Sequence, residues 1–403
     1  MRQNRPAISG QNSLALTRTS SNGLEKRPKL RFPGFDEPYR SAQLGDIAAL
    51  VNRTDPKSNA PIMMLSAGNG FIMQSEKYSR DNAGQSLKKY ILLKQGELAY
   101  NHGASKAKQF GCCYELTEPE ARIPYVYHCF KINNHEYTPF IAMALNNAKM
   151  DKQLKRLVSS SVRMDGLLNI SFEDYMSVTI HLPSPSEQKR IADFLQKIDE
   201  RIAAQEELLA SLKKYKRGAI AHILSGKSKA FSSASSWMQK NLGDLCSEFR
   251  SGRNISSTLI HETGDYPVYG GNGIRGYCDR YSHEGEYVVI GRQGALCGNV
   301  RIIQGQNYLS EHAIAVRANA DNDTGFLLYL LGFMKLGQYS DQGAQPGLAV
   351  NKLLRLKCTV PDKKTQSKIA SVLLRLDSQL SNQEKMLSIL INQRKAFLQQ
   401  LFI

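Results

Sequence analysis

Glycines and polar side chains alternate in a segment that matches a nucleotide-binding pattern. Residues 271–276, GNGIRG, fit the G-x-G-x-x-G spacing that binds the pyrophosphate of a dinucleotide when it joins a strand to a helix. The following residues, YCDRY (277–281), lack the periodicity of a helix. The pattern therefore favours a glycine-rich loop whose backbone approaches nucleic acid, with Asn272 and Arg275 as base or phosphate contacts. A purely structural turn is an equal alternative.

A second segment in this half of the chain, IGRQGA (290–295), places Arg292 and Gln293 directly after an apolar run. Arginine binds guanine through two hydrogen bonds, and glutamine binds adenine in the same way. We expect these side chains to recognise bases; the alternative for Arg292 is a salt bridge within a loop. Glu311 and His312 lack a Ser, Cys or metal-ligand partner at a recognisable spacing, which favours a structural or DNA-proximal turn over catalysis.

The first half of the chain has a comparable mixed segment, YNHGASKAK (100–108), after a Gly-Glu step. Aromatic, amide and basic side chains in alternation suit contacts with bases and phosphates, and solvated loop lysines are the alternative. Three serines at 159–161 precede an arginine and could bind a phosphate together with it. The candidate DNA contacts in this half are Tyr100, Asn101, His102, Lys106, Lys108 and Arg163.

The charge balance favours a polyanionic partner. The 403 residues include 53 Lys and Arg against 36 Asp and Glu, a formal net charge of +17, and such an excess is typical of nucleic-acid-binding proteins. An anionic membrane is the weaker alternative, because no apolar run approaches the ~20 residues that span a bilayer. The 7 cysteines are scattered without metal-ligand spacing, which indicates free thiols in a reducing cytoplasm.

Motifs for catalysis on nucleic acids are missing from the sequence. It contains no Walker A loop for ATP, no Asn/Asp-Pro-Pro-Tyr/Phe motif of adenine methyltransferases and no carboxylate–lysine cluster of nucleases. We therefore expect a non-catalytic protein that binds no cofactor or metal by itself. Any chemistry on the nucleic acid must come from partner proteins.

The chain contains a copy of one of its own segments, which indicates how the candidate residues are positioned. Residues 182–225 align without a gap to residues 360–403, and 10 of the 44 positions are identical, among them a proline, two glutamines and an aspartate. Unrelated helices share an apolar rhythm but not matched polar residues. The sequence therefore contains a duplication.

The repeated segments have the 3,4 spacing of a heptad seam. The expected seam residues are Leu195, Ile198, Ile202, Gln205, Leu209 and Leu212 in the first copy and Leu373, Leu376, Leu380, Gln383, Leu387 and Leu390 in the second. We expect two long helices that form an antiparallel coiled coil. About 39 residues at ~1.5 Å each give a helix of roughly 58 Å, longer than the ~34–36 Å of one DNA turn.

The rest of the chain forms two blocks that begin alike, with QLGDI at 43–47 and NLGDL at 241–245. Glycine-bounded runs at 287–290 and 313–316 predict strands, and residues 138–147 and 326–337 predict helices, so both blocks are expected to be α/β. The predicted parts are a disordered extension (1–29), a first globular domain (30–182), a long helix (183–228), a second globular domain (229–359, with a Ser-rich linker at 226–236) and a second long helix (360–403).

This layout resembles the specificity subunit of type I restriction–modification systems over residues 30–403. The resemblance rests on the repeated helices and on PKLRFPGF (28–35), VRMDGLLNISFEDY (162–175), YPVYGGNGIRGYCDRY (266–281) and IGRQGALCGNV (290–300). It implies a pseudo-two-fold arrangement of two target-recognition domains, each recognising half of a bipartite site in double-stranded DNA. It also implies that the helix pair sets their spacing and docks two methyltransferase subunits, joined by restriction subunits, with S-adenosylmethionine, ATP and Mg bound by those partners.

Three alternatives remain open from the sequence. The first is the specificity subunit of a type II system whose partner fuses methylation and cleavage in one chain, which neighbouring genes would distinguish. The second, less favoured, is a nucleotide-dependent enzyme that uses residues 271–276. The third is a coiled-coil scaffold with basic surfaces and no sequence preference, which competition between specific and random duplexes would test.

Overall fold

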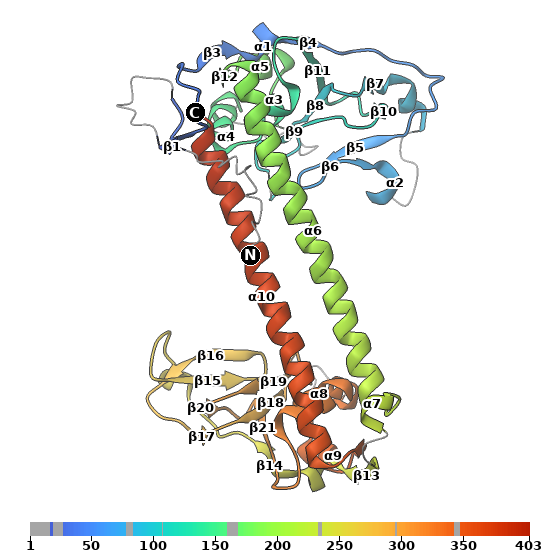
Figure 1. The fold of residues 1–403 in the computed structure, drawn as a ribbon, viewed down its shortest axis with the longest axis vertical. Coiled ribbons are helices and arrows are strands. Elements are labelled where there is room, and N and C mark those ends of the chain that lie inside the picture. The colour runs from blue at the N-terminus through green and yellow to red at the C-terminus, as the bar shows by residue number, and fades with distance from the viewer. Residues whose placement is uncertain are drawn as a thin grey trace, which may run out of the picture. The chain divides into compact units, whose positions relative to one another are not determined.

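The computed structural model describes residues 17–18, 27–77, 84–106, 108–158, 168–232, 236–294, 296–341 and 347–403 (Figure 1). Most of the predicted N-terminal extension, residues 233–235 of the predicted linker, and Arg163 lie outside the described residues. The chain divides into two compact units, residues 1–203 with 388–403, and residues 204–387. Each unit therefore holds one globular α/β domain and a part of each long helix.

The first unit is built on an antiparallel four-stranded sheet of order β4-β11-β8-β9, flanked by the pairs β5·β6, β7·β10, β3·β12 and β1·β2. Its strands are β1 (Thr17–Arg18), β2 (Leu30–Arg31), β3 (Arg40–Gln43), β4 (Ala48–Leu50), β5 (Met63–Ser66), β6 (Gly70–Met73), β7 (Ile91–Lys94), β8 (Leu98–Asn101), β9 (Cys112–Glu115), β10 (Glu120–Ile123), β11 (His128–Ile132) and β12 (Thr179–Leu182). Its shorter helices are α1 (Leu44–Ile47), α2 (Gln74–Lys77), η1 (Gly84–Lys89), α3 (Thr138–Leu145), α4 (Ala148–Leu157) and α5 (Phe172–Met176).

The second unit repeats this sheet as β14-β21-β18-β19 and adds a second sheet of order β16-β15-β20-β17. Its strands are β13 (Met238–Asn241), β14 (Cys246–Ser251), β15 (Tyr266–Gly270), β16 (Gly273–Cys278), β17 (His283–Glu284), β18 (Tyr287–Gly291), β19 (Val300–Ile303), β20 (Gln306–Leu309), β21 (Ala313–Ala318) and β22 (Lys357–Val360). Its shorter helices are α7 (Lys229–Ser232), η2 (Leu242–Leu245), η3 (Ser257–Leu259), α8 (Thr324–Phe333), η4 (Leu336–Tyr339) and α9 (Val350–Leu354). The predicted linker thus contains a short helix, α7.

Both units begin and end in the same way, as the repeated Leu-Gly-Asp segments predict. In each, a strand before that segment pairs with the strand that leads into a long helix: β3 with β12, and β13 with β22. The turn is closed by matching capping boxes, Gln43 with Asp46 and Asn241 with Asp244. The two α/β domains are therefore copies of one architecture.

The long helices are α6 (Pro185–Leu224) and α10 (Lys363–Leu401), of 40 and 39 residues. In the first unit the start of α6 packs on the end of α10, where the rings of Phe194 and Phe397 lie 5.1 Å apart. In the second unit the end of α6 contacts the start of α10, where Lys216 pairs with Asp377. The predicted antiparallel helix pair is confirmed (Figure 1).

A buried glutamine joins each long helix to its domain. In the first unit, Gln188 of α6 accepts a hydrogen bond from the backbone N–H of Tyr137, the N-cap of α3, at 2.9 Å. In the second, Gln366 of α10 accepts one from Asp323, the N-cap of α8, at 3.0 Å. Because both side chains are fully buried, these bonds are shielded from water and fix each helix on its domain.

The hydrophobic cores combine sheet, short helix and long helices. In the first unit, Leu195 of α6 and Leu401 of α10 belong to the same cluster as Phe130 of β11 and Phe140 of α3. In the second unit, the corresponding cluster joins the end of α6 and the start of α10 to α8 and to β14, β18 and β21. The ends of the long helices are thus part of the domain cores.

Candidate nucleic-acid interface

The G-x-G-x-x-G motif lies in a β-hairpin. Strand β15 ends at Gly270, and β16 begins at Gly273 and pairs antiparallel with it. The phosphate-binding form of this motif requires a helix after the glycines, whose N-terminus stabilises the pyrophosphate. The alternative of a nucleotide-dependent enzyme using residues 271–276 is therefore not favoured.

Three segments of the second unit meet beside this hairpin turn. A Cβ atom on Gly271 would lie 2.6 Å from the carbonyl oxygen of Gln293, and one on Gly291 would lie 2.3 Å from the carbonyl oxygen of Gly271. Only glycine permits so close an approach of two backbones. The backbone N–H of Arg292 also donates to the carbonyl of His312 at 2.9 Å. Residues 271–275, 291–293 and 310–312 thus form one surface, called the three-segment surface below.

This surface carries polar and basic side chains. Asn272 and Arg275 are exposed on the hairpin. Arg301 of β19 lies beside them, because its guanidinium would be 2.4 Å from a Cβ atom on Gly273. The structure brings these residues together with Arg292 and Gln293, which come from a distant part of the chain. Sequence reasoning missed Arg301, which carries no local motif.

The two residues after β18, Arg292 and Gln293, differ in how exposed their side chains are. Arg292 is half-buried, and its guanidinium donates to the carbonyls of Glu311 at 3.3 Å and Leu348 at 3.4 Å, so its side chain lies along the surface. Among the residues that the structure describes, no carboxylate forms a salt bridge with Arg292, which was the alternative. Gln293 is exposed, and its side-chain oxygen lies 2.5 Å from Nδ1 of His312. Of the two, Gln293 is the better placed to contact a base.

Two candidates of the first unit are buried, which corrects their expected role. Tyr100 is 1 % exposed, stacks on Tyr175 with ring centroids 3.8 Å apart, and donates to the carbonyl of Phe110 at 2.7 Å. Burial raises the pKa of Tyr100 well above its ordinary value. His102 is also buried, with each ring nitrogen 3.0 Å from a backbone carbonyl oxygen. Neither side chain is accessible to a DNA base, because Tyr175 of α5 packs over Tyr100 and the His102 ring lies between the carbonyls of Leu168 and Val126.

The remaining described candidates of this segment lie nearer the surface. Asn101 accepts a hydrogen bond from the backbone N–H of Gly103 at 2.9 Å, which forms a tight turn after β8. Lys108 donates to the carbonyl of Asn146 at the end of α3, at 2.8 Å, and so has a structural partner. Lys106 is exposed and remains a candidate phosphate contact.

In the seam of the helix pair, polar side chains of α6 contact polar side chains of α10. In the second unit, the Gln205 amide donates to the side-chain oxygen of Gln383 at 2.7 Å. The ion pairs Asp199–Arg394 in the first unit and Lys216–Asp377 in the second occupy equivalent positions of the duplicated segments. The other expected seam residues are buried or half-buried: Leu195, Ile198, Ile202, Leu209, Leu212, Leu373, Leu376, Leu380, Leu387 and Leu390.

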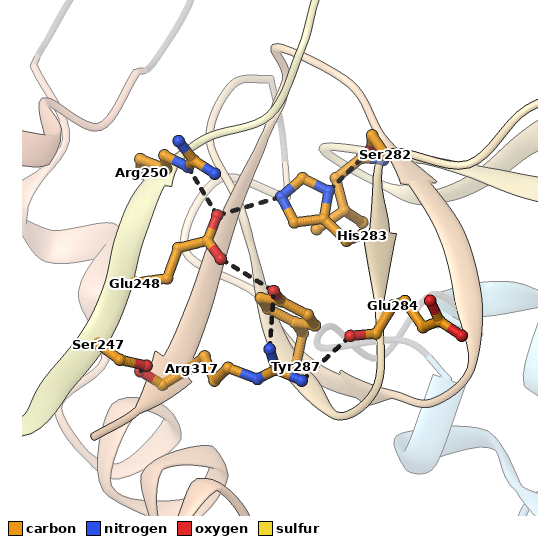
Figure 2. Close-up of polar contacts among 9 residues, drawn as sticks. Ser247, Glu248, Arg250, Ser282, His283, Glu284, Tyr287 and Arg317 are labelled. Carbon is orange, nitrogen blue, oxygen red and sulfur yellow. Dashed lines mark hydrogen bonds and ion pairs between the residues drawn. The ribbon is translucent and has the colours of Figure 1, made fainter. Parts of the chain in front are cut away.

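In the second unit, Ser282, His283 and Glu248 form a polar network whose residue types match those of a nucleophile, a base and an acid (Figure 2). Ser282 Oγ lies 2.7 Å from His283 Nδ1, and His283 Nε2 lies 3.3 Å from Glu248 Oε1. Ser282 Oγ also accepts from the backbone N–H of Leu309 at 2.9 Å. Because His283 is only 6 % exposed, this network joins strands β14, β17 and β20 and does not present a nucleophile.

The same network extends to Tyr287 and Arg317 (Figure 2). The Tyr287 hydroxyl donates to Glu248 Oε2 at 2.9 Å, and the Arg317 guanidinium lies 4.6 Å from the Tyr287 ring centroid. Burial alone would raise the pKa of Glu248, but hydrogen bonds from Arg250 and Tyr287 and nearby positive charge outweigh it, and the pKa is lowered. Burial lowers the pKa of His283, which favours the neutral ring.

Neither a metal site nor a membrane span is found in the described parts of the chain. Among those residues, no group of three His, Cys, Asp or Glu side chains is placed to hold a metal ion. Within the same residues, neither long helix nor any shorter one has the length and apolar character to cross a bilayer.

Comparison with known proteins identifies the family. The chain belongs to the family of the type I restriction modification DNA specificity domain, whose model matches residues 40–214 and 234–389. The match covers parts of both units and of both long helices. The predicted family is therefore confirmed.

Individual relatives agree with this family. The chain is 44 % identical over 144 residues to the type I restriction enzyme EcoprrI specificity subunit of Escherichia coli, a match that spans 35 % of the chain and 36 % of that relative. Thus only about a third of the length of this curated relative is matched.

Two solved structures resemble the fold. They are the S subunit of a type I restriction–modification system from M. genitalium (19 % identity, TM-score 0.62, 94 % of this chain and 99 % of that one) and a chain from a study of complex assembly and conformational transition of the type I system (14 % identity, TM-score 0.52, 90 % and 97 %). They support the architecture of two α/β domains and two long helices.

Proposed function

We propose that this chain is the DNA sequence-specificity subunit of a type I restriction–modification complex. Each α/β unit recognises one half of a bipartite site in double-stranded DNA. The observation that carries the proposal is the duplication: two copies of one α/β architecture, each anchored to a long helix by an equivalent buried glutamine, Gln188 or Gln366. A protein with two equivalent recognition units suits a site with two halves.

The helix pair has the task of spacing these units. Its polar contacts fix one register, because a shift along the seam would separate Gln205 from Gln383 and leave half-buried charges such as Asp199 and Asp377 without their partners. A fixed register implies one distance between the two half-sites. We propose that the same helices dock two methyltransferase subunits, to which restriction subunits are added.

Exposed apolar side chains support a docking role for the helices. Leu208 and Tyr215 on α6 are 44 % and 64 % exposed, and Met386 and Ile389 on α10 are 41 % and 50 % exposed. Apolar side chains on the outer face of a helix cost solubility unless a partner covers them. We propose that the chain itself catalyses no reaction, and that S-adenosylmethionine, ATP and Mg bind to the partner subunits.

The deciding experiment maps N6-methyladenine across the genome of cells with and without this gene. We expect a split motif, two short sequences separated by a fixed spacer, that is methylated only when the gene is present. Restoring the gene should restore the same motif. An unchanged methylation pattern in the deletion strain, in which the partner methyltransferase is still expressed, would contradict the proposed function.

A further inference from the structure

The exposed side chain of Gln293 is held by a short chain of polar contacts. Glu311 Oε1 lies 3.0 Å from His312 Nε2, and His312 Nδ1 lies 2.5 Å from the side-chain oxygen of Gln293. These three residues come from two segments, the end of β18 and the turn between β20 and β21. Both segments belong to the three-segment surface defined above, so the chain of contacts lies where bases would be recognised.

The arrangement determines which end of the Gln293 amide is available. A carboxylate only accepts hydrogen bonds, so His312 Nε2 donates to Glu311. The amide oxygen likewise only accepts, so His312 Nδ1 donates to Gln293. This bond engages the amide oxygen and fixes the orientation of the amide, and the amide N–H groups of Gln293 are left to bind another acceptor.

The burial of one carboxylate oxygen of Glu311 is energetically unfavourable, which suggests a role beyond packing. Its second oxygen, Oε2, is buried and has no hydrogen-bond partner among the described residues. A buried carboxylate oxygen without a donor is destabilising, and such groups are kept where another requirement outweighs the cost. Here the requirement is the hydrogen bond from His312.

We propose that Glu311 and His312 are positioning residues that orient Gln293 so that its amide N–H groups face DNA as hydrogen-bond donors. This inference rests on the proposed function. Gln293 would then bind an acceptor on a base edge in the major groove, which is O6 or N7 of guanine, N7 of adenine or O4 of thymine. The two-bond pairing with adenine expected from the sequence would have to use the second lone pair of an amide oxygen that already accepts a hydrogen bond from His312.

The basic residues around this group fit such a contact. Arg275 is exposed on the hairpin, and Arg301 lies against Gly273. Arginines beside a base contact bind phosphates and fix the orientation of the protein on the duplex. Gln293 therefore has both a fixed side chain and nearby phosphate anchors, and these are the conditions for discrimination between bases.

The test is selection of duplexes from a random library with the full-length chain, followed by sequencing of the bound DNA. We expect Gln293→Ala to reduce the preference for one base pair, in one half-site, about 10-fold, while affinity for random duplex stays within about two-fold. His312→Asn should reduce the preference at the same base pair. His261→Asn, which changes an exposed histidine of the same unit, is the matched control and should change nothing.

Two further variants separate positioning from a general structural effect. If His312 acts through Gln293, then His312→Asn should have no further effect when combined with Gln293→Ala. Gln293→Glu keeps a partner for His312 but presents an acceptor, so the preferred base should change to one with a donor, cytosine or adenine. Circular dichroism of each variant should show that the chain remains folded.

The outcomes distinguish the inference from the function on which it rests. If the wild-type chain enriches a split motif and His312→Asn leaves it unchanged, or lowers affinity for all sequences equally, the positioning role is wrong and the proposed function stands. If the wild-type chain enriches no motif, the proposed function and this inference both fail.

Discussion

Glu248 and His283 are titratable residues of one buried network, and both have lowered pKa values. For each, the folded pKa lies below the unfolded one, whose ordinary values are 4.5 and 6.5. The unfolded chain therefore binds more protons in acid, and the stability contributed by each group is lost as the pH falls. The two effects act in the same direction.

We predict that the free energy of unfolding of the second unit decreases as the pH falls from neutral to below 6.5, and again below 4.5. Urea unfolding at a series of pH values measures it. His283→Gln removes the buried titrating ring and should flatten the change above about pH 5. The exposed His261→Gln is the control. Stability that rises on acidification would contradict the assignment of these shifts.

Single residues also show where sequence reasoning stopped. The segment 100–108 had the expected mixture of aromatic, amide and basic side chains, but Tyr100 and His102 proved to be buried. A local pattern predicts a strand, but it does not predict which distant segment packs over that strand, and it is Tyr175 of α5 that covers Tyr100. The contact of His312 with Gln293 joins segments 19 residues apart, which only the folded chain brings together.

At the scale of elements, the sequence predicted the long helices well because they are repeated and periodic. Helices α6 and α10 span most of the predicted ranges 183–228 and 360–403. The predicted helix at 138–147 is α3, whereas the one at 326–337 is shorter, since α8 ends at Phe333 and Lys335 has a left-handed backbone. Strand pairing between β15 and β20, which is parallel, has no local signal and was not predictable.

Adjacent leucines on α6 test the helix seam. Leu209 is 5 % exposed and Leu208 is 44 % exposed. We predict that Leu209→Ala lowers the free energy of unfolding of the second unit by about 2–4 kcal/mol, because it leaves a cavity between packed helices. Leu208→Ala should change it by less than about 0.5 kcal/mol. Equal effects in denaturant unfolding would mean that Leu209 does not face the partner helix.

At the scale of the whole chain, the duplication and the charge were both apparent in the sequence. The repeat at a constant offset predicted two equivalent domains, and the matching capping boxes and glutamine contacts agree with it. The target sequence was not predictable, because base recognition depends on a few side chains whose orientation is set by the fold. The net charge of +17 acts on every DNA sequence alike.

This charge leads to a prediction for binding without sequence preference. Each phosphate that a lysine or arginine neutralises releases condensed counterions, so affinity falls steeply as salt is raised. For about six such contacts, we predict a loss of roughly 1,000-fold in affinity for a random duplex between about 50 and 200 mM salt. Fluorescence anisotropy of labelled DNA measures this directly.

Lys106 provides the test at one position, because it is exposed and is a candidate phosphate contact. Lys106→Ala should weaken binding to all sequences equally and reduce the salt slope by about 1. Gln293→Ala should leave the slope unchanged, since a neutral side chain releases no counterion. If instead Lys106→Ala altered base preference and left the salt slope constant, Lys106 would be a base contact. The assignment of phosphate contacts to charged side chains and of base contacts to the neutral Gln293 would then be wrong.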